Sequence, residues 1–531
     1  MKFFNTAGPN QPDIHYTLSP LSRWNLQEIL HLIQNRKYFI LHAPRQTGKT
    51  TCLLALMHYL NTSGECKALY VNVEAAQAAR ENVTDAMSII YSSLENSEKI
   101  YCKTNVLEEN RKKLQEKGNL SLLQNSLVLL SQSSEKPIVM LIDEIDALVG
   151  DTLISVLRQI RAGYADRPQN FPQSIILCGI RDVRDYRIHS SSKEIITGGS
   201  AFNIKAESLR LGNFTLDDIQ TLYNQHTQET GQLFAEEIFP LVWEYTYGQP
   251  WLVNALAYEA CFRIPEGKDR KKVIDKELIC QAKENLILRR DTHLDQLTDK
   301  LQEERVKRVI LPILQGNEDK LDTLNDDVQY GIDLGLIRRS ENGLEISNAI
   351  YKEIVPREIS WTTQLSIEPI QKPIWYINPS NNKLEFSKLL KAFQEFFREH
   401  SESWLERFDY KEAGPQLLLQ AFLQRIVNGG GYITREYGLG RKRTDLLVEW
   451  YAIPKDPTSK QKVVVECKVI RKSIEKTLEE GLEQTAEYTD TCGAEESHLI
   501  LFDKTPNKTW DEKIFYFERE HKGKLIHVWG M

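Results

Sequence analysis

The chain has no uninterrupted apolar run of about 18 residues, which is the length that a membrane-spanning helix requires. Its amino-terminal residues also lack the basic start and the continuous apolar stretch of a secretory signal. The eight cysteines are scattered without a Cys-x-x-Cys pair, which argues against a disulfide framework and against a zinc site. We therefore expect a cytoplasmic protein with reduced thiols and no membrane contact.

Neither sign of charge is in large excess, since 67 Lys and Arg residues stand against 74 Asp and Glu residues and give a net charge of −7. This balance argues against a chain that coats nucleic acid along its whole length, although it is compatible with a local basic groove. With 531 residues, of which 41% are hydrophobic and 27% charged, the composition is globular and sufficient for about three or four domains.

Short apolar runs alternate with helical patterns in the first part of the chain, as is typical of a parallel sheet covered on both faces. From Thr215 the pattern becomes helical, and a Gly-Gln-Pro break at 248–250 precedes a helix expected at 251–262. Strands of the α/β core are expected at 37–43, 68–73, 137–142, 174–179 and 202–209.

The chain is expected to contain two globular parts. The Gly-led segments at 335–339 and 343–347 suggest a wing hairpin, and a segment with three prolines suggests a linker. The expected limits are an α/β core at 1–214, a helical lid at 215–294, a winged helix at 295–360, a linker at 361–384 and a second unit at 385–531.

The string Ala43-Pro-Arg-Gln-Thr-Gly48-Lys49-Thr50 lies between an expected strand and an apolar helix. It matches the Walker A pattern, with Ala43 in place of the first glycine. The backbone N–H groups of such a loop cradle phosphate oxygens, Lys49 reaches the β and γ phosphates, and the Thr50 hydroxyl ligates Mg²⁺. These residues predict a site for ATP and Mg²⁺.

A second apolar run, at 138–142, ends in Asp143 and Glu144, as a Walker B strand does. We expect Asp143 to hold the water shell of the metal and Glu144 to orient or deprotonate the attacking water. The alternative is nucleotide binding without turnover, with Glu144 capping the following helix.

Over about residues 21–355, these motifs resemble those of AAA-like ATPases of the archaeal-ATPase and STAND kind. The strings Gly179-Ile-Arg181-Asp182 and Tyr247-Gly-Gln-Pro250-Trp add to the resemblance. It implies that Arg181 lies in a sensor 1 region and that Pro250 belongs to a nucleotide-contacting Gly-x-Pro element. Arg184 or Arg187 could equally act as a finger in trans within a homo-oligomer, or form surface ion pairs.

A second set of candidate catalytic residues lies in a stretch whose pattern predicts the element order αβββαβ. Asp445 opens one expected strand, and Glu466-Cys467-Lys468 closes the next. Because side chains alternate along a strand, Glu466 and Lys468 should share one face while Cys467 lies on the other. Asp445 and Glu466 offer hard oxygen ligands for Mg²⁺ or Mn²⁺, and Lys468 can position a hydroxide. The elements are expected at 412–427, 432–437, 444–450, 462–469, 473–491 and 498–502.

With Gln484 in the following helix, this pattern resembles the PD-(D/E)XK nuclease superfamily in its restriction-endonuclease-like form, over about residues 385–531. The resemblance implies that Gln484 lies near the metal, with Tyr488 one turn later, and that an acid of the first helix joins the site. Glu412 is the candidate for this acid, and Glu436 and Glu395 are alternatives. The basic string 441–443 either contacts phosphates or forms an exposed turn.

The leading interpretation is an ATPase whose nucleotide state controls a metal-dependent nuclease that acts on nucleic acid, with DNA favoured over RNA. Family association places such fusions in bacterial defence. One alternative is a signalling or assembly ATPase with a catalytically silent nucleic-acid or protein-binding module. Another is a motor that translocates on DNA, although the chain carries no additional helicase-like motif string.

Overall fold

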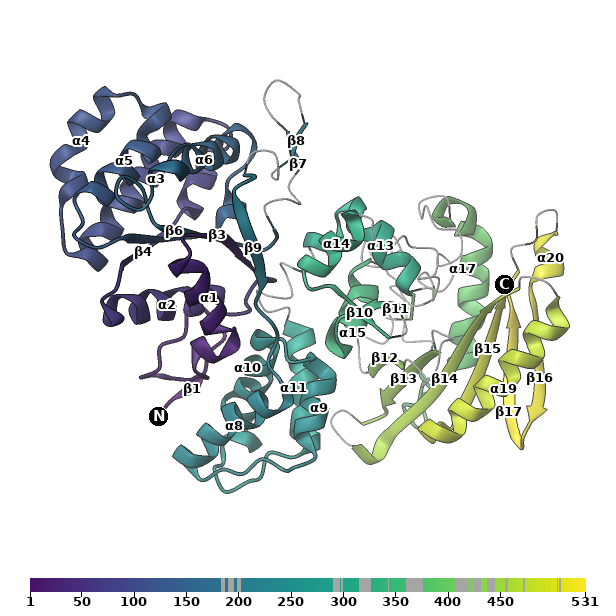
Figure 1. Ribbon diagram of the computed structural model, residues 1–531. Coiled ribbons are helices and arrows are strands. Elements are labelled where there is room, and N and C mark those ends of the chain that lie inside the picture. The colour runs from purple at the N-terminus through teal and green to yellow at the C-terminus, as the bar shows by residue number, and fades with distance from the viewer. Residues whose placement is uncertain are drawn as a thin grey trace. The chain divides into compact units, whose positions relative to one another are not determined.

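The computed structural model contains two compact units. The first comprises residues 1–293 and 329–336, and the second comprises residues 294–328 and 337–531. Figure 1 colours the chain by residue number, from purple at the N-terminus to yellow at the C-terminus. The structure describes residues 1–182, 187–189, 195–197, 202–289, 297, 299–314, 326–341, 343–359, 376–405, 419, 422–423, 431–436, 445–453, 457–470, 473–503, 505 and 508–531.

A parallel five-stranded sheet forms the centre of the first unit, in the order β4-β5-β6-β3-β9. Strands β3, β4, β5 and β6 are largely buried apolar runs, as expected for a sheet covered on both faces, whereas the edge strand β9 is polar and partly exposed. The α/β core is therefore confirmed, although β9 begins later than expected because residues 202–204 form a turn in which Phe202 packs into the core. The strands are β3 (Tyr38–His42), β4 (Lys67–Asn72), β5 (Ile138–Asp143), β6 (Ser174–Gly179) and β9 (Lys205–Arg210).

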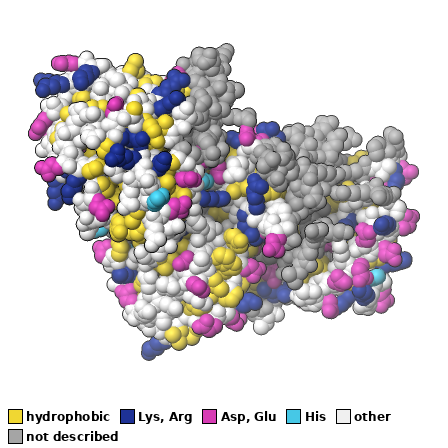
Figure 2. Space-filling view, viewed as in Figure 1, with side chains coloured by type: hydrophobic (Ala, Val, Ile, Leu, Met, Phe, Trp, Pro, Cys, Tyr) yellow, Lys and Arg dark blue, Asp and Glu magenta, His cyan; other side chains and the backbone are white. Residues whose placement is uncertain are grey.

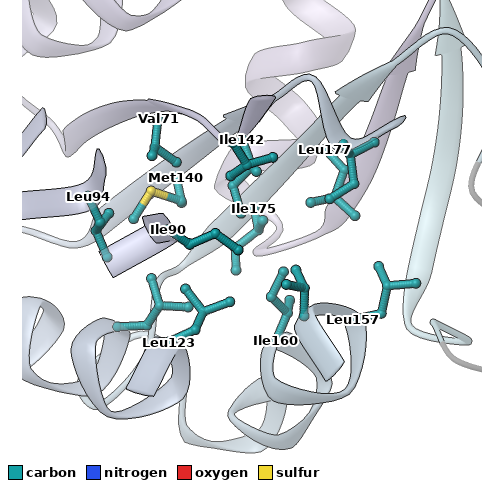
Figure 3. Packing of buried hydrophobic residues seen from close by; sticks show 14 of the residues in the cluster. Val71, Ile90, Leu94, Leu123, Met140, Ile142, Leu157, Ile160, Ile175 and Leu177 are labelled. Carbon is teal, nitrogen blue, oxygen red and sulfur yellow. The ribbon is translucent and has the colours of Figure 1, made fainter. Parts of the chain in front are cut away.

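Helices cover both faces of this sheet (Figure 1). On one face, Ile90, Leu123 and Ile160 from three helices pack toward strand residues such as Met140 and Ile175 (Figure 3). The other face packs against α1 and α2. The carboxyl ends of β3 and β5 therefore lie at the same edge of the sheet, on either side of β6, and α2 begins at this edge. The helices are α1 (Leu26–Gln34), α2 (Lys49–Ser63), α3 (Val83–Ser97), α4 (Val106–Glu116), α5 (Leu122–Gln132) and α6 (Gly150–Ala162).

The expected helical segment after Thr215 is present, and Thr215 forms a capping box with Asp218. At the break before α10, a Cβ on Gly248 would lie 1.9 Å from the Phe214 carbonyl oxygen, so this position requires glycine. The helix that follows this break is shorter than the expected 251–262, because α10 ends at Tyr258 and a π-helical turn follows. The helices are α8 (Leu216–Thr230), α9 (Ile238–Thr246), α10 (Pro250–Tyr258) and α11 (Lys276–Arg289).

The amino-terminal residues pack against these helices. The short parallel strands β1 (Phe3–Phe4) and β2 (His15–Tyr16) place the Phe4 ring 5.4 Å from the Tyr223 ring of α8. The indole Nε1 of Trp251 donates a hydrogen bond of 2.8 Å to the Thr6 carbonyl. The segment at 5–10 is thereby held over the start of α10.

The second unit contains a mixed six-stranded sheet in the order β12-β13-β14-β15-β17-β16. Helix α19 (Ile474–Cys492) packs on one face of it, and α17 (Phe386–Leu405) packs on the other. Strands β14 and β15 are parallel, as are β15 and β17, and the other pairs are antiparallel. The strands are β12 (Gly431–Glu436), β13 (Asp445–Tyr451), β14 (Lys460–Val469), β15 (Glu496–Phe502), β16 (Phe515–His521) and β17 (Lys524–Gly530).

The expected αβββαβ order accounts for β12 to β15 and α19, but it omits the hairpin of β16 and β17 that extends the sheet. The expected wing hairpin is present as the antiparallel strands β10 (Ile337–Ser340) and β11 (Gly343–Ile346). Most of the helix expected at 412–427 and of the linker expected at 361–384 lies outside the described residues. The remaining helices are α13 (Glu304–Leu314), α14 (Asp326–Asp333), α15 (Ala349–Ile359) and α20 (Trp510–Lys513).

Two surface properties bear on partners. On the face in Figure 2, the described Lys and Arg side chains are interspersed with Asp and Glu side chains, in keeping with the net charge of −7. Each helix in the described part of the chain is too short or too polar to cross a membrane.

Candidate functional site

The loop between β3 and α2 has the geometry of a phosphate cradle. Gly48 adopts φ +90°, a conformation that L side chains rarely take, and it is the residue from which α2 begins. The positive end of α2 and its unpaired backbone N–H groups therefore face the loop. The buried Lys49 ammonium donates to the Ala43 carbonyl at 2.9 Å and to the Pro44 carbonyl at 3.0 Å. Both partners are neutral carbonyls, so the ammonium forms no ion pair and can attract an anion, although the Glu144 and Asp146 carboxyl groups lie within range of its charge.

The carboxylate of Asp143 is fixed beside this loop by three donors. Its Oδ2 accepts hydrogen bonds from the Thr50 hydroxyl at 2.7 Å and from the Tyr70 hydroxyl at 3.0 Å. Its Oδ1 accepts one from the Glu144 backbone N–H at 3.0 Å. Burial, assisted by the negative charge of Asp143, raises the pKa of Tyr70, so this phenol keeps the proton that it donates. The Walker A residue Thr50 and the Walker B residue Asp143 are thus joined by a direct hydrogen bond.

Glu144 lies at the same edge of the sheet in a left-handed conformation, with φ +59°. Burial raises the pKa of its carboxyl group, while the Lys49 charge acts in the opposite direction. Glu144 occupies the N-cap position of the short 3-10 helix Ile145–Ala147, but its side chain makes no cap hydrogen bond to this helix. Its carboxylate is therefore available for a ligand.

Asp146 connects the Walker B loop to the end of β6. Its Oδ2 accepts a hydrogen bond from the Ile180 backbone N–H, and a Cβ on Gly179 would lie 2.6 Å from the same oxygen. Burial raises the pKa of Asp146. The neighbouring Arg181 guanidinium lies 4.9 Å from the centre of the Tyr330 ring. The structure thus places Arg181 beyond the carboxyl end of β6, where the sequence predicts a sensing element.

A pocket of about 100 Å³ opens beside the phosphate loop. Its walls come from the amino-terminal residues, the loop itself, the residues after β9 and the first turns of α10. Pro250, expected to contact nucleotide, is the first residue of α10 and lines this pocket together with Gly48. The lining residues are Asn5, Thr6, Ala7, Gly8, Asn10, Thr17, Leu18, Pro20, Arg23, Gln46, Thr47, Gly48, Thr51, Cys52, Phe214, Pro250, Trp251 and Asn254.

In the second unit, three of the expected site residues come together. Lys468 forms an ion pair with Glu466 and donates a hydrogen bond to Gln484 Oε1 of α19. Glu466 is 1% exposed, whereas Cys467 packs into the cluster under α17 on the opposite face. The expected alternation along β14 is therefore observed. Tyr488 lies one turn further along α19 and is half-buried.

The other expected residues of this cluster are placed less completely. The register of β13 and β14 pairs Leu446 with Val465, so Asp445 stands one step further, level with Glu466, and Glu436 pairs with Asp445. Glu395 is exposed on α17, the helix on the other face, so the structure does not bring it to Glu466. Among the described residues, no three His, Cys, Asp or Glu side chains are grouped as a metal site. Glu412, Arg184 and the string 441–443 lie outside the described residues, and Arg187 begins β7 (Arg187–His189), which pairs with β8 (Ile195–Thr197).

Sequence reasoning missed several residues around the phosphate loop. Arg23 donates to the Thr47 carbonyl and lies 4.8 Å from the centre of the Phe214 ring. Tyr70 and Asn254 also lie at the site, although no motif contains them. Each reaches the loop through tertiary contacts, so local patterns carry no signal for them.

The chain matches one family model and is similar to several solved structures. The model of the AAA-like domain matches residues 25–355. A Walker-type ATPase of Pyrococcus abyssi has 14% identity over 66% of this chain and 99% of its own, with a TM-score of 0.44. Cdc6p from Pyrobaculum aerophilum has 13% identity over 64% of this chain and 93% of its own, with a TM-score of 0.34. The Thermotoga maritima RuvB Holliday junction branch migration motor has 12% identity over 62% of this chain and 94% of its own, with a TM-score of 0.32. No curated protein matches the chain.

Proposed function

Because the chain belongs to the AAA-like domain family, a family of P-loop ATPases, we propose that its first unit binds and hydrolyses ATP at the carboxyl edge of the parallel sheet. The observation that carries this proposal is the hydrogen bond between Thr50 and Asp143, beside the buried Lys49 ammonium, which hydrogen-bonds two neutral carbonyls. It joins the phosphate loop to the acidic strand end, which is the arrangement that phosphoryl transfer requires.

Each residue of this edge has a role in the proposal. The backbone from Ala43 to Gly48 and the Lys49 ammonium hold the phosphates. The Thr50 hydroxyl and the Asp143 carboxylate are oxygen donors 2.7 Å apart, a donor set that fits Mg²⁺. When bound, Mg²⁺ would neutralise charge on the phosphates. Glu144 accepts a proton from the attacking water, Arg181 senses the nucleotide and Pro250 contacts the nucleoside.

We further infer that the second unit is a metal-dependent nuclease under nucleotide control, with DNA favoured over RNA. The contact of Lys468 with both Glu466 and Gln484 supports this inference. The backbone register of β13 and β14 also supports it, because Asp445 is one position beyond the Leu446–Val465 pair and is therefore level with Glu466. Asp445 and Glu466, joined by Glu412, would hold Mg²⁺ or Mn²⁺, and a place in bacterial defence would follow.

One observation favours a second candidate, in which this unit is a silent nucleic-acid or protein-binding module of a signalling or assembly ATPase. The Glu466 carboxylate already has an internal cation, Lys468, at ion-pair distance. A metal would have to compete with that cation for the same carboxylate. A lasting ion pair at this position would leave the unit without catalytic activity.

The two candidates are separated by a cleavage assay on the full chain. Plasmid DNA and structured RNA are incubated with Mg²⁺ or Mn²⁺, with and without ATP, and the products are separated on gels. The test variant is Glu466→Ala, and the matched control is Glu449→Ala, because Glu449 forms a comparable ion pair with Lys460 on the same sheet at 3.0 Å.

Under the nuclease proposal, Glu466→Ala abolishes cleavage and Glu449→Ala retains it. A change in rate on adding ATP shows that the two units are coupled. Equal cleavage by Glu466→Ala and the parent protein contradicts the assignment of the site. No cleavage of any substrate by the parent protein favours the silent module.

A further inference from the structure

The pocket beside the phosphate loop contains a buried acceptor that the fold does not satisfy. Asn254 of α10 lines this pocket and is 6% exposed. Its Nδ2 donates to the Pro250 carbonyl at 2.8 Å, which fixes the orientation of the amide. Its Oδ1 is buried and has no hydrogen-bond partner in the protein. Buried polar atoms are rarely left in this state, so the position calls for a donor from a ligand.

The walls around this acceptor suit a flat heterocycle. Phe214, Trp251 and Pro250 supply apolar surface, while the Trp251 indole and the Asn10 backbone N–H, which donates to the Thr51 hydroxyl at 3.1 Å, hold the amino-terminal wall in place. Ligand pockets combine such apolar walls with a few fixed polar atoms that determine specificity.

We propose that Asn254 Oδ1 accepts a hydrogen bond from the 6-amino group of adenine and thereby determines specificity for adenine over guanine nucleotides. This inference rests on the proposed ATP site. Adenine presents an N–H donor at this position, whereas guanine presents a carbonyl oxygen. Two acceptors would then face each other, and a site built around one hydrogen bond rejects the analogue that cannot form it.

A second buried acceptor, Gln46 Oε1, also lines the pocket and has no hydrogen-bond partner. Gln46 belongs to the phosphate loop, two positions before Gly48. Asn254 lies on the same helix as Trp251 and Pro250, among the apolar walls. The base is therefore assigned to Asn254 and the phosphates to the loop.

The test compares ligands that differ only at the purine. The full chain is titrated with ATP, with purine riboside triphosphate, which carries hydrogen in place of the 6-amino group, and with GTP. The parent protein should bind ATP about 10-fold more tightly than purine riboside triphosphate, the effect of one neutral hydrogen bond. GTP should bind more weakly still.

The variant Asn254→Leu, of similar size, should bind ATP and purine riboside triphosphate with equal affinity. The matched control is Asn285→Leu, since Asn285 is an amide of α11 that donates to Glu259 at 2.9 Å and does not line the pocket. This control should retain the preference. The parent comparison among ligands stands without any variant, so a misfolded variant does not weaken the test.

Equal binding of ATP and purine riboside triphosphate by the parent protein overturns the inference, as does an undiminished preference in Asn254→Leu. If ATP binds and Lys49→Ala lowers its affinity, but no preference for the amino group exists, the base assignment fails while the ATP site stands. If no triphosphate binds the parent protein, the ATP site fails and the base assignment fails with it.

Discussion

Each unit has a lysine beside acidic residues, Lys49 buried at the start of α2 and Lys468 15% exposed near the end of β14, but the two lysines are paired differently. Lys49 of the first unit hydrogen-bonds the carbonyls of Ala43 and Pro44, so it forms no ion pair, although Glu144 and Asp146 lie within range of its charge. Lys468 of the second unit pairs with the Glu466 carboxylate and also donates to Gln484.

This difference indicates which ligand the Lys49 site and the Lys468 site can each accept. A buried cation without a counter-ion is electrostatically costly, and a phosphate removes that cost on binding. A buried ion pair is already balanced, and a divalent metal gains the carboxylate only by displacing the cation. The first site is therefore open to an anion, and the second is closed until its ion pair separates.

The largest expected effect concerns Glu144, whose carboxylate is the proposed base of the open site. Glu144→Gln should lower the rate of ATP hydrolysis by about 10²–10⁴-fold, the usual contribution of a positioned base. ATP affinity should change little, because Gln fills the same space. Steady-state phosphate release and a nucleotide titration measure the two properties. Glu116→Gln, on the exposed surface of α4, is the control, and unchanged hydrolysis in Glu144→Gln would contradict the role.

Lys468→Met tests whether the second site is closed. Removal of the cation leaves the Glu466 carboxylate buried without its counter-ion, so the unit should lose about 3 kcal/mol of stability. Hydrogen exchange of peptides from β14 and α19 measures this loss. Lys460→Met is the matched control and should lose less, because its partner Glu449 is 18% exposed, against 1% for Glu466. Equal losses in the two variants would break the comparison.

Lys49→Met tests whether the first site is open. The affinity for ATP should fall by about 100-fold, because a buried phosphate contact is lost. The unfolding temperature without nucleotide should not fall, since the variant removes a buried charge that forms no ion pair. Calorimetric titration and thermal unfolding measure both properties, with Lys117→Met on the surface as control. A marked loss of stability without ligand would show that a negatively charged partner stabilises Lys49 in the folded protein, as Glu466 does for Lys468.

The raised pKa of Glu144 predicts a dependence of stability on pH. A carboxyl group with a pKa raised by folding binds its proton more tightly in the folded state, so its ionised form destabilises the protein above the folded pKa. Glu144→Gln should therefore have the higher unfolding temperature at pH 7.5. The difference should shrink as the pH falls through the folded pKa toward 4.5, the ordinary value for a glutamate. A difference that is constant with pH would refute the assigned ionisation.

The smallest effect is expected at Tyr70, whose hydroxyl donates to Asp143 at 3.0 Å. Tyr70→Phe keeps the ring in β4 and removes one of three donors to this carboxylate. Hydrolysis should slow by about 3-fold, in line with the loss of one modest hydrogen bond. We also expect a change in the concentration of Mg²⁺ that gives half-maximal hydrolysis. A purely structural role of Tyr70 would leave this concentration unaltered.

The sequence was sufficient for features that depend on neighbouring residues. Strands β3, β4, β5 and β6 of the first sheet are largely apolar on both faces, so runs such as 138–142 identify them, and the P-loop is a continuous string that ends at Thr50. The alternation along β14 likewise predicted the common face of Glu466 and Lys468.

Features that depend on distant residues were not predictable in this way. The hairpin of β16 and β17 was missed because exposed charged positions interrupt its apolar pattern, as in Phe515–His521. Tyr70 reaches Asp143 only after β4 and β5 pair, and Asn254 reaches the pocket only after α10 packs beside the phosphate loop. Such contacts are properties of the packed molecule.

The hydrogen bond from Trp251 to Thr6 joins positions 245 residues apart. During synthesis, the phosphate loop leaves the ribosome long before the helix that completes the neighbouring pocket. A nascent chain that ends before α10 possesses the loop but not this wall. Tight capture of a nucleotide therefore has to wait until nearly half of the protein has been translated, and ATP cannot use this pocket to guide the folding of the first strands.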